Sequence, residues 1–330
     1  MLPSFDEDTI LFDGLASDQK SWSDYYIGIM NTMKKWSWED RVLCGPAEKY
    51  LLRLPDNYIP LTVTSPPYAD LRKYKGHGFN FDPIAKELYR VTAEGGVLVW
   101  VIGDVVKPHP VTRCPSETGM PFKQVLAFME LGFSLHDTMA FEKDNPIPRP
   151  TQRRYTQQFE YMFVLTKGEL KTWNPIKEPC KYAGVKSTGK YYENPDTVVP
   201  YRASSVKMEK GKVILDADGK PLQKLDEEGK PVEKRIAPEK IKGNLWNYFV
   251  GRDTHEDKVR GKKKKYHPAT MKLQLAKDHI LSWSNPGDLI LDPMCGGGTT
   301  LLAAKELGRH YLGFDISAEY IENCKERLGL

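Results

Sequence analysis

The chain of 330 residues contains no run of about 18 consecutive apolar side chains, so we expect no membrane-spanning helix. Its five cysteines include no CxxC pair, and its seven histidines show no spacing typical of metal ligands. Neither a disulfide framework nor a metal site is therefore predicted. The first eight residues hold three acidic and no basic side chains, which argues against a signal peptide. These absences together favour a cytoplasmic protein without a metal.

The net positive charge of the chain is small, but it is concentrated in one segment. The net charge is +4, whereas residues 201–265 contain 18 Lys and Arg against 11 Asp and Glu, a balance of +7. A basic segment attached to a near-neutral body is what a region that binds a polyanion would look like. A solvated surface loop would carry the same charge, so the charge alone leaves both interpretations open.

Apolar runs and helical spacings alternate along most of the chain, which predicts an α/β fold. The run 97–102 is almost wholly apolar, as in a central parallel strand that is covered on both faces. The other expected strands are 58–64, 135–142, 159–166, 289–292 and 311–315. The expected helices are 81–92, 121–131, 270–283, 299–307 and 317–328.

This rhythm is interrupted twice, and the interruptions set the expected domain boundaries. Residues 1–41 form an aromatic-rich N-terminal extension, with a helix expected around 23–36. The α/β pattern then runs over 42–168, is lost over 169–265, and returns over 266–330. We therefore expect one α/β body assembled from two halves, with residues 169–265 inserted between them.

The first chemical motif lies in the second half. The strand 289–292 ends at Asp292 and is followed by Pro293, a turn with three successive glycines and then Thr299 and Thr300. Glycines admit a ligand against bare backbone, and the amide groups at the start of a helix face it. The next strand ends at Asp315, where a carboxylate can accept hydrogen bonds from ribose hydroxyls. The pattern predicts a nucleoside-binding unit.

The second motif is Thr64-Ser65-Pro66-Pro67-Tyr68, at the end of the strand 58–64. Two prolines stop the strand, because proline cannot donate to the ladder, and they stiffen the loop. Both motifs resemble the signature motifs of DNA methyltransferases that act on exocyclic amino groups. Their order, with the Ser-Pro-Pro-Tyr motif first, resembles the circularly permuted β group of that family.

The resemblance implies a Rossmann-like S-adenosylmethionine-dependent methyltransferase fold. Such a fold has a mostly parallel seven-stranded sheet with one antiparallel strand, helices on both faces and, here, a basic target-recognition insert. Asp315 would bind the ribose, Ile316 would pack on the adenine, and the glycine turn would approach the methionine. The cofactor-binding residues that the resemblance implies are Asp292, Pro293, Met294, Cys295, Gly296, Gly298, Thr299, Asp315, Ile316, His267 and Asp104.

The resemblance also implies a catalytic group and a substrate. Ser65, Pro66, Pro67 and Tyr68 would act on a base rotated out of double-stranded DNA, with Tyr68 stacked on that base. Serine at position 65 favours the 4-amino group of cytosine over the 6-amino group of adenine, which stays an alternative. RNA or a protein amide as substrate and a non-catalytic DNA-binding subunit are further alternatives. The resemblance admits a cognate restriction endonuclease as a partner and a nucleoid-associated location.

Phosphate contacts are expected from two basic loops. Arg149, Arg153 and Arg154 follow the strand 135–142, in a proline-stiffened loop that would flank the base pocket. Lys262 and Lys263 belong to a run of four lysines near the end of the insert. The oligomeric state and the recognition sequence do not follow from these patterns.

Overall fold

The computed structural model describes residues 37–67, 79–144, 146, 154–184, 208–209, 212–213, 237–248 and 271–330. The chain divides into two compact units, residues 1–40 and residues 41–330. All helices and strands described below belong to the second unit. The helix expected around residues 23–36 lies outside the described residues.

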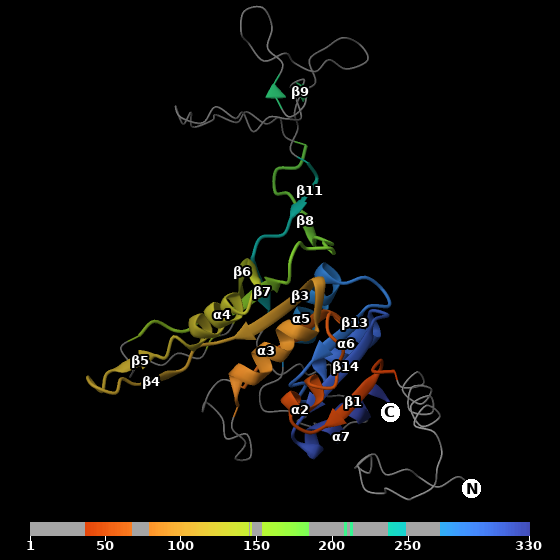
Figure 1. Cartoon of the computed structure of the whole chain (residues 1–330). Coiled ribbons are helices and arrows are strands. Elements are labelled where there is room, and N and C mark those ends of the chain that lie inside the picture. Colours follow the sequence, from red (N-terminus) through yellow and green to blue (C-terminus); the bar gives the residue numbers. More distant parts are fainter. Residues whose placement is uncertain are drawn as a thin grey trace, which may run out of the picture. The chain divides into compact units, whose positions relative to one another are not determined.

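Within the described residues, eight strands form one sheet at the centre of the second unit (Figure 1). Strand β7 runs antiparallel to both of its neighbours, and every other neighbouring pair is parallel. The expected mostly parallel sheet with one antiparallel strand is confirmed. In spatial order the strands are β1 (Arg41–Cys44), β14 (His310–Asp315), β13 (Leu289–Asp292), β2 (Ile59–Thr64), β3 (Thr92–Ile102), β7 (Phe159–Thr166), β6 (Ser134–Lys143) and β12 (Leu245–Tyr248).

Helices cover both faces of the sheet, which explains why its central strands are apolar. Val97, Val99 and Val101 of β3 share a buried cluster with residues of α5 (Leu273–Trp283), α6 (Thr299–Glu306) and α7 (Ala318–Leu328). Trp100 points to the opposite face, where its ring meets Phe81 of α3 (Phe81–Val91) and Phe128 of α4 (Met120–Glu130). The short helix α2 (Ala47–Leu51) packs on α3. The sheet therefore lies between two helical layers.

The eighth strand corrects the expected sheet. Seven strands were expected, with residues 169–265 outside the sheet, but Leu245–Tyr248 (β12) pairs in parallel with β6 at the sheet's edge. Trp246 and Tyr248 are buried there, whereas Leu245 is exposed. Four residues in a polar context give too little alternation to identify a strand.

The direction of β7 decides where the chain leaves the sheet. We call the end at which the parallel strands finish the carboxyl edge and the opposite end the amino edge. Because β7 is antiparallel, Thr166 lies level with Val97, so the chain leaves β7 at the amino edge. Strand β12 is parallel to β6, so the chain approaches it from the side of the amino edge, but its first residue, Leu245, pairs with Ala140 and lies level with Ile102. Residues 167–244 therefore leave the sheet at the edge opposite to the end of β2 and approach β12 from the side of that edge.

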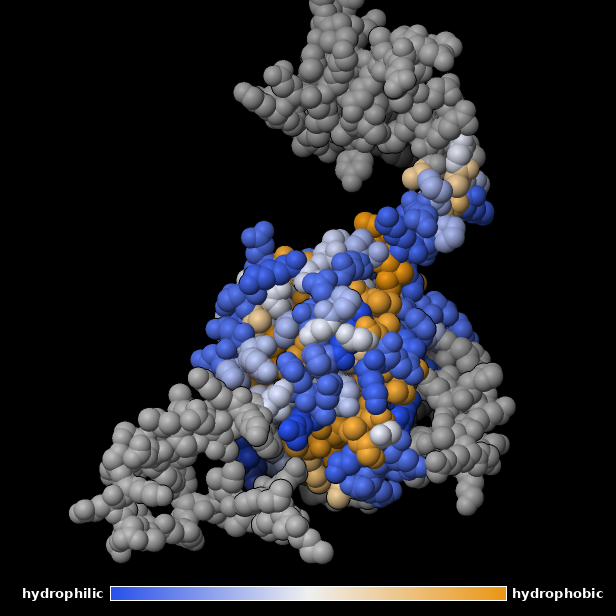
Figure 2. Space-filling view, turned by 90° about the vertical axis from the view of Figure 1, so that its right-hand side faces the viewer, coloured by the Kyte–Doolittle hydropathy of each residue, from blue (hydrophilic) through white to orange (hydrophobic). Residues whose placement is uncertain are grey.

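Outside the main sheet the structure describes three small strand pairs. β8 (Lys177–Pro179) pairs with β11 (Glu239–Ile241), and with the adjoining residues 180–184 and 237–238 they form what we call the arm. Figure 2 shows hydrophobic surface where the arm joins the body, whereas the arm itself is mostly hydrophilic. β4 (Val106–Pro108) pairs with β5 (Pro115–Glu117), and β9 (Met208–Glu209) with β10 (Lys212–Val213). None of the helices in the described residues could cross a membrane.

Candidate functional site

The two chemical motifs meet at the carboxyl edge, because β2 and β13 are neighbouring parallel strands. Leu61 pairs with Ile290 and Thr62 with Leu291. The Thr64 hydroxyl donates a hydrogen bond of 2.7 Å to Asp292 Oδ1, although the two residues are 228 positions apart. The first residue of the Thr-Ser-Pro-Pro-Tyr motif and the last residue of β13 are thus joined directly. The loop that begins at Ser65 and the glycine turn after Asp292 therefore leave the sheet side by side.

Asp292 is buried at this junction. Burial, together with the charge of the nearby Asp315, raises the pKa of its carboxyl to about 6, although the hydrogen bonds from Thr64 and from the Met294 amide act in the opposite direction. The Met294 N–H donates to the same Oδ1 atom over 3.2 Å. One carboxylate oxygen therefore fixes both the end of β2 and the start of the turn after β13. This makes Asp292 an organiser of the carboxyl edge.

The glycine turn is bent back onto β14. The Cys295 N–H donates to the Phe314 carbonyl over 2.8 Å, and the Gly298 N–H donates to the Cys295 carbonyl over 2.8 Å. Gly296 and Gly298 have φ angles of 50° and 76°, a left-handed conformation in which a side chain would be strained. Gly298 is also the N-cap of α6. The turn thus places bare, buried backbone rather than side chains at the start of a helix, an arrangement that suits a nucleoside ligand.

Asp315 and Ile316 lie beside this turn, at the end of β14. The Asp315 carboxylate accepts hydrogen bonds from the Gly296 N–H over 2.9 Å and from the Ser317 N–H over 2.8 Å. Ile316 is 43% exposed, although it directly follows a strand whose apolar residues are buried. An acid next to an exposed apolar side chain matches the two halves of an adenosine. The residues present therefore fit the cofactor that the sequence implied.

Helix α7 packs against the glycine turn. A methyl group added at Gly298 would overlap Cys324 of α7, so the close approach requires glycine. Arg327 donates to the Gly297 carbonyl over 3.2 Å and to the Thr299 hydroxyl over 2.9 Å. Hydrogen bonding with Cys324, together with burial, raises the pKa of the Cys295 thiol, which keeps it protonated. Cys295 is therefore a packing residue and not a nucleophile.

The remaining residues expected at the site divide into two groups. Ser65, the buried Pro66 and the half-buried Pro67 lie directly after β2, as expected. Met294 is half-buried, and Pro293 and Thr299 are buried, all within or next to the turn. Outside the described residues lie Tyr68, Arg149, Arg153, Lys262, Lys263 and His267.

Two expected ligand contacts are occupied by the protein itself. The Asp104 carboxylate accepts hydrogen bonds from the amides of Val105, Thr118 and Gly119 and from the Thr118 hydroxyl, over 2.6–3.1 Å. Asp104, expected near the cofactor, thus ties the end of β3 to the start of α4. Arg154, expected at phosphate, forms an ion pair of 2.5 Å with Glu117 of β5. Both side chains act first as structural groups of this edge.

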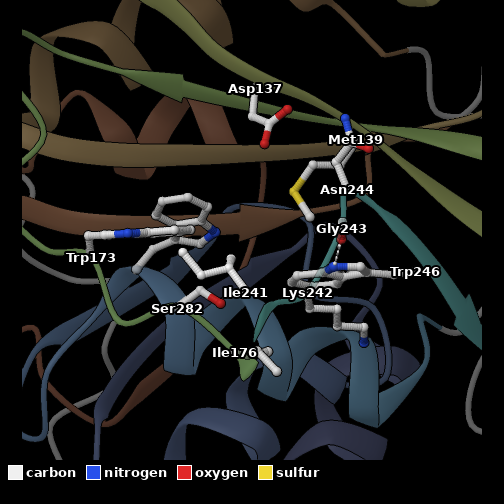
Figure 3. Close-up of a pocket in the computed structure, with 11 residues that line it drawn as sticks. Asp137, Met139, Trp173, Ile176, Ile241, Lys242, Gly243, Asn244, Trp246 and Ser282 are labelled. Atoms are coloured by element: carbon white, nitrogen blue, oxygen red, sulfur yellow. Dashed lines mark hydrogen bonds between the residues drawn. The ribbon is translucent and has the colours of Figure 1, made fainter. Parts of the chain in front are cut away.

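A cluster at the amino edge was not expected from the sequence. A pocket of about 40 Å³ lies between the two ends of the arm and helix α5 (Figure 3). Trp173 stacks on Trp283 at 4.8 Å on one side of it. Its volume admits a few water molecules only, and it lies at the edge opposite to the glycine turn. We therefore assign it to the attachment of the arm and not to cofactor binding.

Strand β12 is held to α5 by polar groups that no sequence pattern indicated. The Tyr248 hydroxyl donates to Asp278 Oδ2 over 2.7 Å, and burial together with this bond raises the pKa of the Tyr248 hydroxyl. Lys242 Nζ lies 3.7 Å from the same carboxylate oxygen. Asp278 is on a helix predicted correctly, but Tyr248 comes from a strand that was not predicted, and Lys242 precedes that strand. The eighth strand is thus locked to the half of the body that carries the glycine turn.

The fold and the site define a class: a permuted, Rossmann-like α/β protein with a glycine turn that fits a nucleoside beside a Ser-Pro-Pro loop. Residues 59–326 match the N6/N4 DNA methylase family, and the chain belongs to that family. It is 43% identical over 275 residues to the orphan methyltransferase M.BamHII of Bacillus amyloliquefaciens, covering 83% of this chain and 89% of the relative. The family expected from the two motifs is confirmed.

Solved structures of low sequence identity share the fold. The PvuII DNA methyltransferase, described as cytosine-N4-specific, is 17% identical with a TM-score of 0.56, over 87% of this chain and 85% of that one. A DNA modification methylase of Thermus thermophilus, solved with S-adenosyl-L-methionine, is 21% identical with a TM-score of 0.52. That match covers 88% of this chain and 93% of the other. The expected methyltransferase fold is confirmed.

Proposed function

We propose that this DNA methylase transfers a methyl group from S-adenosylmethionine to the 4-amino group of cytosine in double-stranded DNA, at specific sites. The observation that carries the proposal is the Thr64–Asp292 hydrogen bond, which holds Ser65 and Pro66 beside the glycine turn. A methyl donor held by that turn and a base amine held at Ser65 would meet at one edge of the sheet. The family and the cofactor-bound relative support the donor.

The chemistry explains why hydrogen-bond acceptors are needed at this place. The lone pair of an exocyclic amine is delocalised into the ring, so the nitrogen is a poor nucleophile. S-adenosylmethionine, when bound, would supply an electrophilic methyl group and leave as S-adenosylhomocysteine, and the methylated amine would lose one proton to water. Ser65 Oγ and the Pro66 carbonyl can accept hydrogen bonds from the two amine hydrogens, which localises the lone pair on nitrogen. Pro67 restricts the backbone that follows that carbonyl, which helps to keep it in place.

In this scheme most of the rate enhancement comes from the positions in which the reacting groups are held. Two fixed acceptors that point at the amine act without reorganising during the reaction. Holding the amine in line with the methyl group supplies a further entropic advantage. The target nitrogen is inaccessible within the stacked duplex, so the base must be rotated out, and we propose that Tyr68 stacks on it. Asp315, Ile316 and the glycine turn bind the cofactor in this scheme, with His267 completing the methionine end.

Cytosine is favoured over adenine by the residue at position 65. The resemblance associates serine here with the 4-amino group of cytosine and aspartate with the 6-amino group of adenine. Both side chains accept a hydrogen bond, so the discrimination lies in geometry rather than in charge. The family covers both bases. The adenine alternative therefore differs from the proposal only in the base that is methylated.

The domain organisation follows the same proposal. Residues 42–168 supply the base-binding half and residues 266–330 the cofactor-binding half, with target recognition assigned to 169–265. Lys262 and Lys263 would contact phosphates together with Arg149 and Arg153. Both lysines follow β12 in the sequence, and the chain leaves β12 at the carboxyl edge. That exit, on the side of the sheet where Ser65 lies, supports a phosphate contact near the target base.

Nucleoside analysis tests the proposal. Duplex DNA is incubated with the full chain and S-adenosylmethionine, digested, and examined by mass spectrometry. We expect 4-methylcytosine; 6-methyladenine instead would replace cytosine by adenine, and label found only in RNA or protein would refute DNA as the substrate. The variant Ser65→Ala should lower turnover while the affinity for the cofactor stays unchanged. Ser65→Asp, which keeps an acceptor, should retain more activity than Ser65→Ala.

A further inference from the structure

The β4–β5 hairpin projects from the carboxyl edge and is separate from the main sheet (Figure 1). It begins four residues after the end of β3 at Ile102. Thr64, at the end of the neighbouring strand β2, pairs with Trp100 of β3. The hairpin therefore rises from the same edge as Ser65 and the glycine turn. The proposed reaction by itself gives this hairpin no role.

The tip of the hairpin is exposed but well ordered by its own hydrogen bonds. The His109 N–H donates to the Cys114 carbonyl over 2.8 Å, and the Arg113 N–H donates to the His109 carbonyl over 2.9 Å. His109 Nδ1 accepts from the amides of Val111 and Thr112 over 3.3 Å and 3.2 Å. The loop is thus held in one shape by its own backbone and one histidine.

The base of the hairpin is fixed to the body. Asp104 accepts the four hydrogen bonds already described, and Glu117 pairs with Arg154. The Thr118 N–H donates to the Val105 carbonyl over 3.1 Å. A two-stranded hairpin is only marginally stable by itself, so this fixation explains how it keeps its place. The hairpin is a rigid projection and not a loose loop.

The composition of the tip does not suit a purely structural role. Val111 is 83% exposed, so the tip buries no apolar core of its own. Residues 105–116 contain Lys107, His109 and Arg113 but no acidic side chain. Arg113 is exposed and has a φ of 57°, a strained conformation for a residue other than glycine. Such strain is typical of segments held in shape for a function.

We propose that the β4–β5 hairpin is a DNA-contacting element that grips the duplex beside the target base. Arg113 binds a backbone phosphate, the Val111 side chain packs against the sugar edge of a groove, and Lys107 adds positive charge. A polyanion is the partner that this basic tip fits, since Glu117, the acidic residue of β5, is paired with Arg154 at the base, and contacts to phosphate set position rather than sequence. The inference rests on DNA being the substrate, but not on which base is methylated.

Salt dependence of DNA binding tests the inference. Each phosphate contact adds about 0.9 to the slope of log affinity against log salt concentration. Arg113→Ala should therefore lower that slope by about 0.9, so that between about 50 and 200 mM salt the native protein loses roughly 3.5-fold more affinity than the variant. Arg113→Glu should weaken binding further. Fluorescence anisotropy with a labelled duplex and the full chain measures both.

Matched controls separate this inference from general charge effects. Arg53 is also exposed, but it lies before β2 at the amino edge, so Arg53→Ala should leave the slope unchanged. In Arg113→Ala the KM for DNA should rise, whereas kcat at saturating DNA and the affinity for S-adenosylmethionine should not change. An Arg113→Ala slope equal to the native one, or an equal effect of Arg53→Ala, would overturn the inference. A native chain without salt-dependent binding to duplex DNA would instead refute DNA as the substrate, and the hairpin's role with it.

Discussion

The hydroxyl of Thr64 is bonded to the carboxylate of Asp292, and this contact joins the two motifs on which the function depends. Both residues are buried, and both are the last residues of neighbouring parallel strands. A hydrogen bond between buried side chains is sensitive to small displacements, because no water molecule replaces a partner that moves away. In the proposed reaction, this one interaction would therefore help to set the separation between the base and the methyl donor.

Replacing Thr64 by valine tests that relationship. Thr64→Val keeps the shape but leaves Asp292 without its side-chain donor, which should cost about 1–3 kcal/mol of unfolding free energy. Turnover should fall as well, because Ser65 directly follows. Thr62 provides the control: it is equally buried on β2, and its hydroxyl has no hydrogen-bond partner among the described residues. Urea unfolding should show no loss for Thr62→Val, and equal losses in both variants would contradict the assigned bond.

The pairing of β2 with β13 illustrates what sequence could predict. Each strand is a buried run that ends at a recognisable motif, so both were located to within one residue. The resemblance to the permuted group implied that the two motifs lie close together. The atoms that join them could not be foreseen, because Thr64 has the side chain of an ordinary strand residue. A partner 228 positions away leaves no local pattern.

Strand β12 and the Tyr248–Asp278 bond show where sequence reasoning ended. Loss of the α/β rhythm after residue 169 was interpreted as an insert outside the sheet. The alternation of strands and helices is lost because the chain leaves the sheet at the amino edge and then contributes only the four residues of β12 to it. Strand β1 and helix α2 were missed for the same reason, since four or five residues carry little periodicity. Short elements are defined by their tertiary partners.

The pKa of Asp292 predicts how stability depends on pH. The carboxyl titrates near 4 in the unfolded chain and at about 6 in the folded one. Between these values the folded protein holds more protons, so stability falls as the pH rises, and above pH 6 the cost is about 3 kcal/mol. Asp292→Asn cannot ionise but can still accept the bonds from Thr64 and Met294. The variant should be more stable than the native protein at about pH 8 and show no gain at about pH 4.

Urea unfolding of the protein without cofactor, at these two pH values, measures the difference. A gain that is the same at both pH values would mean that ionisation of Asp292 is not the cause. A lower stability of the variant at both pH values would mean that the amide nitrogen introduced by the substitution is buried without an acceptor. Only a gain confined to high pH agrees with the raised pKa.

His279 should have the opposite influence. Burial, with help from Lys242, lowers the pKa of its imidazole to about 3. Nδ1 lies 3.3 Å from the Trp283 Nε1 donor, so a proton there would face another N–H. Below about pH 6.5 this histidine is protonated in the unfolded chain but stays neutral in the folded chain. As the pH decreases from there, it therefore lowers the free energy of unfolding by about 1.4 kcal/mol per pH unit. In His279→Gln, which can still accept from Trp283, unfolding followed from about pH 7 to 4 should lack this decline.

Gly298 separates backbone strain from crowding at the glycine turn. In Gly298→Ala the new methyl group would overlap Cys324, and the φ of 76° adds strain, so we expect a loss of roughly 3 kcal/mol and much weaker binding of S-adenosylmethionine. Gly308 has a similar φ of 69°, but no atom lies within 4 Å of the position of an added Cβ. Gly308→Ala should therefore cost only about 1 kcal/mol. Thermal unfolding and cofactor titration measure both variants.

A double variant then tests the cause of the larger loss. Cys324→Ala removes the sulfur that the new methyl group would meet, so Gly298→Ala combined with Cys324→Ala should recover the part of the stability that crowding removed. The part due to φ should remain, at about the cost of Gly308→Ala. If the double variant were no more stable than Gly298→Ala, backbone strain alone would explain the loss. Helix α7 would then not be what fixes the shape of the turn.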